Sequence, residues 1–476
     1  MTEQSPGDTP MTRPSDGPRG ESPKNGRVRV PSPLIPWRMP SGRGATEQPN
    51  ATGDGDAPLT LRFWIMVVLT GAAAGLFGDL MMLLLYNVQY LAFSYHGGSL
   101  ETAAERAGDV QRLVALLAAG VFGGVAWYLL RRFTPGERTD IDDVVWQSGS
   151  RLSFRRSFLT SLISEVVVGL GAPIGRENAP KLMGGASASV LAEWGRLSPG
   201  QKRLLMACGG GAGLAAVYNV PLGGALFTAE IMLGTITLPT ILPALACSGI
   251  ATVTAWLYLP SRPTYAGVPA YHLSTTLVVF SLVAGPLVGL IACGYIRLIG
   301  WVTHYQVTGW KSIVAQIVTM GLIGVVGFGF PQLFGNGKDM ADGAFTTGFV
   351  GTHAFWLLLA LFLLKPLATA AALGSGASGG LFTPTMSTGA VLGAAAGIAW
   401  SLLWPGSPDG AFALIVASAM LGAAMQAPLT GLVLILELTG SGYSLMIPMI
   451  TATVLATVVA RQLDGYSIYS ARLRAG

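Results

Sequence analysis

Long apolar runs dominate this sequence and limit what it can fold into. Clear examples are residues 63–90, 113–130, 277–296 and 355–373. Each run approaches or exceeds the roughly 20 residues that an α-helix needs to cross the hydrocarbon core of a bilayer. Because backbone N–H and C=O groups find no water there, runs of this length satisfy them within helices. The sequence therefore predicts an all-α, polytopic membrane protein.

Charged residues are scarce over the same region. Only 11% of the 476 residues are charged, whereas a soluble domain carries about 25%. Between residues 206 and 460 the only lysines and arginines are Arg262, Arg297, Lys311, Lys338 and Lys365. We expect Lys365 to lie at a helix start, because a proline follows it. The net charge of +5 does not indicate a nucleic-acid partner, since the cations gather in the ends and in short connections.

The two ends of the chain differ from its apolar body. Residues 1–58 are rich in Pro, Gly, Ser and Thr, which predicts a disordered tail without the apolar segment of a signal peptide. Basic residues concentrate in this tail, in connections such as 131–132, and near the C-terminus. Positive segments favour the cytoplasm, so we expect both termini there. The cysteines and histidines lack the spacing of metal ligands, and we expect no metal or cofactor.

A carboxylate beside a cation interrupts the apolar sequence at a glycine break. Residues 175–180 read Gly-Arg-Glu-Asn-Ala-Pro. An ionisable residue at membrane depth is costly, and it usually faces protein or water and has a function. A helix that begins here would aim unpaired N–H groups and a positive dipole end at whatever binds beside Glu177. The alternative is a structural ion pair with Arg176, which neighbours in sequence rarely form well on one helix face.

Two halves of the chain resemble each other. Residues 219–224 (Asn-Val-Pro-Leu-Gly-Gly) return 207 residues later as Gln-Ala-Pro-Leu-Thr-Gly, and each copy precedes an apolar run that ends in Glu230 or Glu437. The glycine segment 171–175 has its partner 205 residues later. This steady offset indicates a duplication, with residues 261–268 as the connection, although chance similarity among apolar, glycine-rich strings is the alternative. Paired glycine-interrupted segments in two halves are typical of a transporter's binding site.

These segments resemble the CLC family of chloride channels and chloride/proton antiporters. Residues 175–177 resemble the start of its Gly-Lys/Arg-Glu-Gly-Pro motif, and residues 380–384 (Gly-Leu-Phe-Thr-Pro) match its Gly-x-Phe-x-Pro motif. Tyr469 lies where the family's late pore tyrosine is expected. The resemblance spans about residues 60–476. It is to the bacterial type, and we expect no C-terminal CBS domains.

The resemblance implies an architecture and partners. The fold would contain two inverted-topology repeats of mostly tilted helices, at about residues 60–258 and 270–470. The protein would be a homodimer in membrane lipid, and each subunit would have its own pathway for chloride or a similar anion. Helix N-termini would converge on that anion near the middle of the membrane.

The resemblance also implies roles for single residues. Glu177 would be the gate, whose carboxylate mimics the anion and leaves the pathway on protonation. The anion would be bound by backbone N–H groups of Leu381 and Phe382 and by the hydroxyl of Tyr469, with Arg176 and Asn178 beside it. Core packing is the alternative for Phe382, and an interfacial anchor is the alternative for Tyr469. A lysine placed directly at the site would hold chloride too tightly for fast turnover.

Three departures from the family pattern stand out. Asn178 adds a side chain where the family has glycine. The central Gly-Ser-Gly-Ile-Pro motif is missing, and in the best-aligned stretch, residues 138–142, Thr139 would supply the hydroxyl beside an acidic inner mouth. Ile231 stands where exchangers carry a proton-transferring glutamate. Its neighbour Glu230 would serve either in a proton pathway or as a structural carboxylate.

Together these features predict a non-enzymatic protein of a bacterial-type inner membrane. It would transport chloride or a similar small anion through a pathway gated by Glu177, in a channel-like or loosely proton-coupled manner. The alternatives are a fully coupled chloride/proton antiporter and a transporter of another anion such as fluoride. A membrane-embedded hydrolase is disfavoured, because no nucleophile–base constellation or metal cluster accompanies Glu177.

Overall fold

The computed structural model describes Thr2 and residues 59–94, 100–135, 141, 145, 151–346, 348–349, 353–441 and 443–472. By its internal contacts the chain falls into two units, Met1–Ser32 and Pro33–Gly476, and every described helix belongs to the second. The predicted disordered tail, except for Thr2, and Thr139 lie outside the described residues. The predictions for these segments therefore remain predictions.

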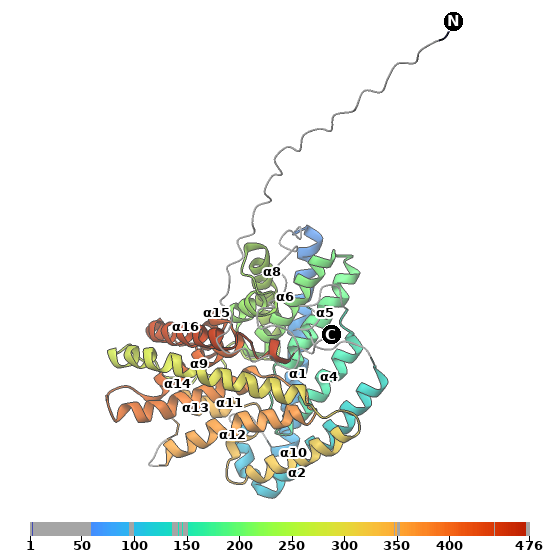
Figure 1. Cartoon of the computed structure of the whole chain (residues 1–476). Coiled ribbons are helices and arrows are strands. Elements are labelled where there is room, and N and C mark those ends of the chain that lie inside the picture. Colours follow the sequence, from blue (N-terminus) through green and yellow to red (C-terminus); the bar gives the residue numbers. More distant parts are fainter. Residues whose placement is uncertain are drawn as a thin grey trace. The chain divides into compact units, whose positions relative to one another are not determined.

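The described part of the chain is almost entirely helical (Figure 1). The helices of the first half are α1 (Leu61–Phe93), α2 (Leu100–Phe133), α4 (Phe154–Gly169), α5 (Asn178–Trp194), α6 (Pro199–Tyr218), α7 (Pro221–Leu226), the π-helix η1 (Phe227–Met232) and α8 (Leu238–Ala255). Those of the second half are α9 (Thr275–His304), α10 (Lys311–Val326), α11 (Lys338–Phe345), α12 (Ala354–Gly374), α13 (Phe382–Ser401), α14 (Asp409–Met425), α15 (Pro428–Thr439) and α16 (Met446–Leu463), with short 3₁₀ turns η2 (Pro331–Leu333), η3 (Tyr443–Leu445) and η4 (Ser470–Arg472).

Several of these helices have the length and composition of membrane spans. By these two criteria six segments of the described chain qualify, namely Leu61–Phe93, Leu100–Phe133, Leu238–Ala255, Thr275–His304, Ala354–Gly374 and Tyr443–Leu463. The four apolar runs predicted from the sequence lie within α1, α2, α9 and α12. The prediction of an all-α, polytopic membrane protein is confirmed.

The repeated proline segments adopt the same local structure in both halves. Asn219 follows the last residue of α6 and Gln426 that of α14 as C-caps, each in the left-handed region with φ of 57°. Pro221 and Pro428 then begin α7 and α15, where the missing N–H of proline costs no helical hydrogen bond. The same turn in both copies supports the duplication inferred from the sequence.

Glycines allow the corresponding helix pairs of the two halves to approach closely. A Cβ atom at Gly184 of α5 would collide with the backbone of Gly209 in α6. In the second half, a Cβ atom at Gly393 of α13 would lie 2.6 Å from the carbonyl oxygen of Phe412 in α14. Small residues of this kind bring membrane helices into backbone contact. These contacts hold α5 against α6 and α13 against α14. The first turns of α5 and α13 form the site described below.

The prediction that Lys365 lies at a helix start is wrong. Lys365 lies inside α12, and Pro366 is accommodated within the helix. Its side chain is fully buried, and its ammonium donates hydrogen bonds to the carbonyl oxygens of Leu333 at 3.0 Å and Gly335 at 2.7 Å. Neighbouring segments can therefore satisfy a polar group within a membrane helix, which a rule based on proline position alone does not anticipate.

Candidate functional site

The two glycine segments that the sequence paired also meet in space. Gly175 and Gly380 form an isolated antiparallel bridge, in which each N–H donates to the other's carbonyl oxygen at 2.8 Å. A Cβ atom on either glycine would collide with the carboxylate of Glu177. Because only glycine leaves this space open, the junction brings the first turns of α5 and α13 together around that carboxylate.

Glu177 is bound at the start of α13. Its carboxylate accepts the backbone N–H of Phe382 at 2.7 Å and the hydroxyls of Tyr218 and Thr383, each at 3.3 Å. Those two hydroxyls are also 2.7 Å apart, and Glu177 is only 4% exposed. A helix N-terminus with its unpaired N–H groups is a ready site for an anion. The carboxylate oxygens thus stand where a small anion would bind.

Arg176 lies beside the carboxylate without pairing with it. Its guanidinium carbon is 5.1 Å from the centroid of the Tyr218 ring, within the range of a cation–π contact. Among the described residues, no ion pair joins Arg176 to Glu177. The structure therefore gives no support to the alternative that Glu177 is half of a structural ion pair.

Two other predicted anion ligands, Leu381 and Asn178, lie at the two helix starts that meet around Glu177. Leu381 is buried and immediately precedes α13, while Asn178 is the half-buried first residue of α5. Their direct roles in anion binding, like that of Arg176, stay predictions. Thr139 is outside the described residues, so its hydroxyl is not placed.

A second group of side chains surrounds Tyr469. Its ring packs edge-on against Phe227, with centroids 5.8 Å apart, and the ammonium of Lys181 lies 5.1 Å from the Tyr469 centroid and 5.9 Å from that of Phe227. Tyr469 is only 6% exposed, which argues against an interfacial anchor. Lys181 was not singled out from the sequence. Lys181 follows Glu177 by four residues, a spacing that places two residues on the same face of a helix. This spacing was the sequence signal that Lys181 lies on the same side of α5 as Glu177.

Two further residues at the site were missed from the sequence, Tyr218 and Thr383. Thr383 belongs to the Gly-Leu-Phe-Thr-Pro motif, so the motif itself indicated a hydroxyl next to Phe382. Tyr218 is the last residue of α6, immediately before the repeated proline segment. No local pattern indicates that its hydroxyl reaches Glu177.

Glu230 and Glu437 cap helices of opposite halves. Glu230 accepts the N–H of Thr430 at 2.7 Å, its hydroxyl at 2.6 Å, and the N–H of Leu429 at 3.3 Å, all in the first turn of α15. Glu437 accepts the N–H groups of Leu222 at 3.0 Å and Gly223 at 2.6 Å in α7. These carboxylates satisfy helix N–H groups that lack partners within their own helices. The contacts of Glu230 favour the structural alternative over the proton pathway.

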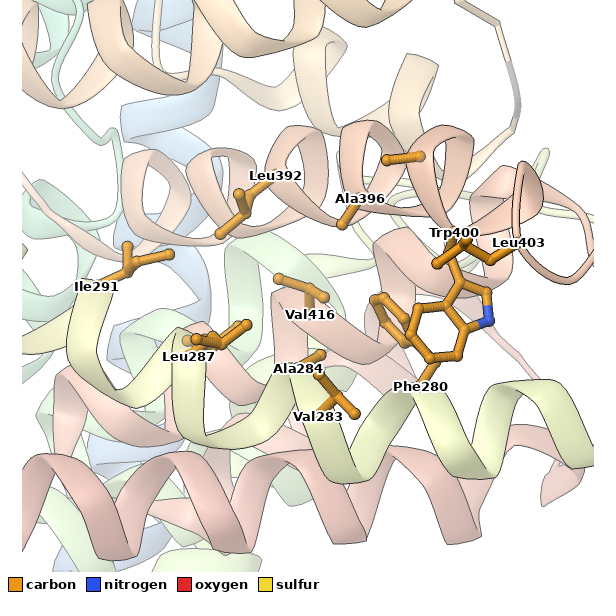
Figure 2. Close-up of a pocket in the computed structure, with 12 residues that line it drawn as sticks. Phe280, Val283, Ala284, Leu287, Ile291, Leu392, Ala396, Trp400, Leu403 and Val416 are labelled. Atoms are coloured by element: carbon orange, nitrogen blue, oxygen red, sulfur yellow. The ribbon is translucent and has the colours of Figure 1, made fainter.

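An apolar cavity of about 290 Å³ lies between α9, α13 and α14 (Figure 2). Phe280, Leu287, Leu392 and Trp400 are among the residues around it. The indole N–H of Trp400 donates to the Thr276 hydroxyl at 2.8 Å. The lining residues are otherwise apolar and aromatic, and none of them is a predicted anion ligand.

Comparison with known proteins assigns the family. A model described as voltage gated chloride channel matches residues 122–461. The chain belongs to this family, the CLC proteins. It is 32% identical over 415 residues to the voltage-gated ClC-type chloride channel ClcB of Salmonella dublin, covering 84% of this chain and 95% of that protein.

Solved CLC structures confirm the fold. A slow cyanobacterial Cl⁻/H⁺ antiporter superposes with a TM-score of 0.75 at 22% identity, covering 86% of this chain and 97% of that one. A CLC-type fluoride/proton antiporter superposes with a TM-score of 0.68 at 19% identity, covering 87% and 98% of the two chains. The CLC resemblance noted in the sequence and the predicted helical architecture are confirmed. Membership of a channel family also agrees with the prediction that the protein is not an enzyme.

Proposed function

We propose that this CLC protein transports chloride or a similar small anion across the membrane through a pathway gated by Glu177. The main support is the position of the Glu177 carboxylate on the first N–H of α13, bound as an anion would be. While ionised, the carboxylate competes with the transported anion for the same donors. On protonation it loses the charge that the helix N-terminus favours, and the anion replaces it.

The coupling to protons is proposed to be absent or loose. Ile231 has no group that carries a proton, and the Glu230 carboxylate is engaged with the first turn of α15. Full chloride/proton exchange is the second candidate, because a structural neighbour is a Cl⁻/H⁺ antiporter. Fluoride is the alternative substrate, because another neighbour is a fluoride/proton antiporter.

The setting of the protein is also part of the proposal. We infer a homodimer in a bacterial-type inner membrane, with each subunit carrying its own pathway and both termini in the cytoplasm. Residues 1–58 would form a disordered tail. Residues 59–476 would form the transport domain, with repeats at about 60–258 and 270–470. Cross-linking in membranes, and accessibility of tags placed at each terminus, test the dimer and the orientation.

Anion flux from liposomes tests the gate. Wild-type flux should rise as pH falls, because protonation releases Glu177 from α13. Glu177→Gln carries no titratable group at that position, so its flux should be independent of pH. Unchanged pH dependence in this variant would refute Glu177 as the gate. Simultaneous proton recording under a chloride gradient separates the coupling alternatives, since uphill proton movement at a fixed ratio would establish exchange.

A further inference from the structure

Glu165 is a fully buried carboxyl group that the gating mechanism leaves without a task. It lies near the end of α4, and its exposed fraction is 0%. Within the described part of the chain, neither of its carboxylate oxygens has a hydrogen-bond partner. A buried charge without a partner is far more costly than a buried neutral group. An ionisable residue inside a membrane protein usually has a function.

The neighbours of Glu165 on α4 hold it close to the gate. Ser161 lies one turn earlier on the same helix face, and its hydroxyl donates to the carbonyl oxygen of Ala179 in the first turn of α5, at 3.2 Å. The hydroxyl of Ser164 donates to the carbonyl oxygen of Ser378, in the glycine segment before α13, at 2.9 Å. The end of α4 is therefore attached to both segments that enclose the gating carboxylate.

Few titratable groups face Glu165, although α4 packs against α1, α2 and α5. Arg176 and Glu177, immediately before α5, are the two residues whose charges act on it. On α1 the titratable neighbour is the phenol of Tyr86, which is hydrogen-bonded to the guanidinium of Arg176. On α2 the closest approach to α4 is at Gly123, which has no side chain. Glu165 therefore shares one cation with the gate.

The two carboxyl groups differ in their hydrogen-bond donors. Glu177 is bound by the N–H of Phe382 and by two hydroxyls, and the ammonium of Lys181 also acts on it. Glu165 has no donor among the described residues. Two carboxylates that share a buried site do not both ionise readily, and the one without donors loses most when it is charged. The site therefore keeps its negative charge on Glu177 and a proton on Glu165.

We propose that Glu165 is the proton donor for the gate, and that its acid form supplies the proton with which Glu177 leaves α13. This inference rests on the proposed function and adds the source of that proton. The O–H bond of Glu165 breaks and an O–H bond forms on an oxygen of Glu177, directly or through a water molecule. The negative charge moves to Glu165, and the transported anion takes the place of the Glu177 carboxylate. Arg176 compensates the new charge, since its buried Nε has no hydrogen-bond partner among the described residues.

The reverse step restores the site. When the anion leaves, the proton returns to Glu165 and the Glu177 carboxylate binds α13 again. No net proton crosses the membrane in this cycle, which agrees with absent or loose coupling. Raising the pH removes the shared proton from the pair of carboxyl groups, so anion flux falls.

Chloride flux from liposomes, measured across a range of pH, tests the proposal. Glu165→Gln keeps the size of the side chain without a transferable proton, so its gate takes up protons only from solvent. The pH of half-maximal flux should fall by about one unit, a tenfold change in proton concentration. Glu165→Asp keeps a titratable proton and should stay closer to wild type. Glu105→Gln is the matched control, since it removes the same group from an exposed position on α2, and it should keep the wild-type profile.

A double variant separates proton donation from a structural role. The gate of Glu177→Gln needs no proton, so adding Glu165→Gln should leave its flux unchanged. An equal loss of flux in both backgrounds, or a wild-type pH profile in folded Glu165→Gln, would overturn the role of Glu165 and leave the proposed gate standing. A flux of Glu177→Gln that still depends on pH would instead refute the gate, and this inference with it. Gel filtration monitors folding, and Glu165→Leu, which has no polar group to bury, provides the same comparison if Glu165→Gln does not fold.

Discussion

Replacing Glu230 by alanine should lower the free energy of unfolding by about 1–3 kcal/mol. The variant removes the acceptor for the N–H of Thr430 at 2.7 Å and for its hydroxyl at 2.6 Å. Loss of a side-chain cap costs about 0.5–2 kcal/mol, and hydrogen bonds to charged groups are worth about 1.5–3 kcal/mol. The bond to the Leu429 N–H is exposed, so water replaces it at little cost.

The second half of the molecule provides a matched comparison. Glu437→Ala removes the equivalent cap from α7 and should cost a similar amount, because its carboxylate accepts two N–H groups at 2.6 and 3.0 Å. Unfolding equilibria in mixed detergent micelles measure both losses. Since α7 and α15 contact each other, the double variant should lose less than the sum of the two single variants.

Glu230→Gln distinguishes a cap from a proton carrier. Glutamine keeps an acceptor oxygen and loses the charge, so its stability should lie between those of wild type and Glu230→Ala. Any proton movement that wild-type protein shows in liposomes should persist in this variant. Full stability combined with lost proton movement would refute the structural role of Glu230.

Two further substitutions test the site junction and the buried lysine. Gly380→Ala places a Cβ atom against the Glu177 carboxylate. Displacing it from the α13 N–H should raise liposome flux at neutral pH about tenfold, since a hydrogen bond to a charged group is worth about 1.5 kcal/mol or more. Gly294→Ala, where a Cβ atom meets nothing within 4 Å, should leave flux unchanged; equal flux in both variants would contradict the reasoning. Lys365→Met leaves two buried carbonyl oxygens without their donor. The free energy of unfolding in mixed micelles should fall by about 1–3 kcal/mol. An unchanged free energy of unfolding would show that the cost of burying the ammonium cancels the gain from its hydrogen bonds.

Much of the fold was predictable because its signals are local. Runs of apolar residues specify membrane helices wherever they occur, since unpaired backbone groups are intolerable in lipid. The proline segments at 219–224 and 426–431 form the same turn in both halves, as their shared pattern indicated. Glu177 also stood out from its sequence context, because a carboxylate at a glycine break in an apolar chain requires an explanation.

The partners of these residues were not predictable from local pattern. Phe382 follows Glu177 by 205 residues in the chain, yet its N–H binds the carboxylate at 2.7 Å. Helix periodicity determines which face a side chain occupies, whereas packing between distant segments determines what that face meets. The charge of Lys181 was therefore visible in the sequence, but its position beside Tyr469 depends on how α5, η1 and the C-terminal segment pack together.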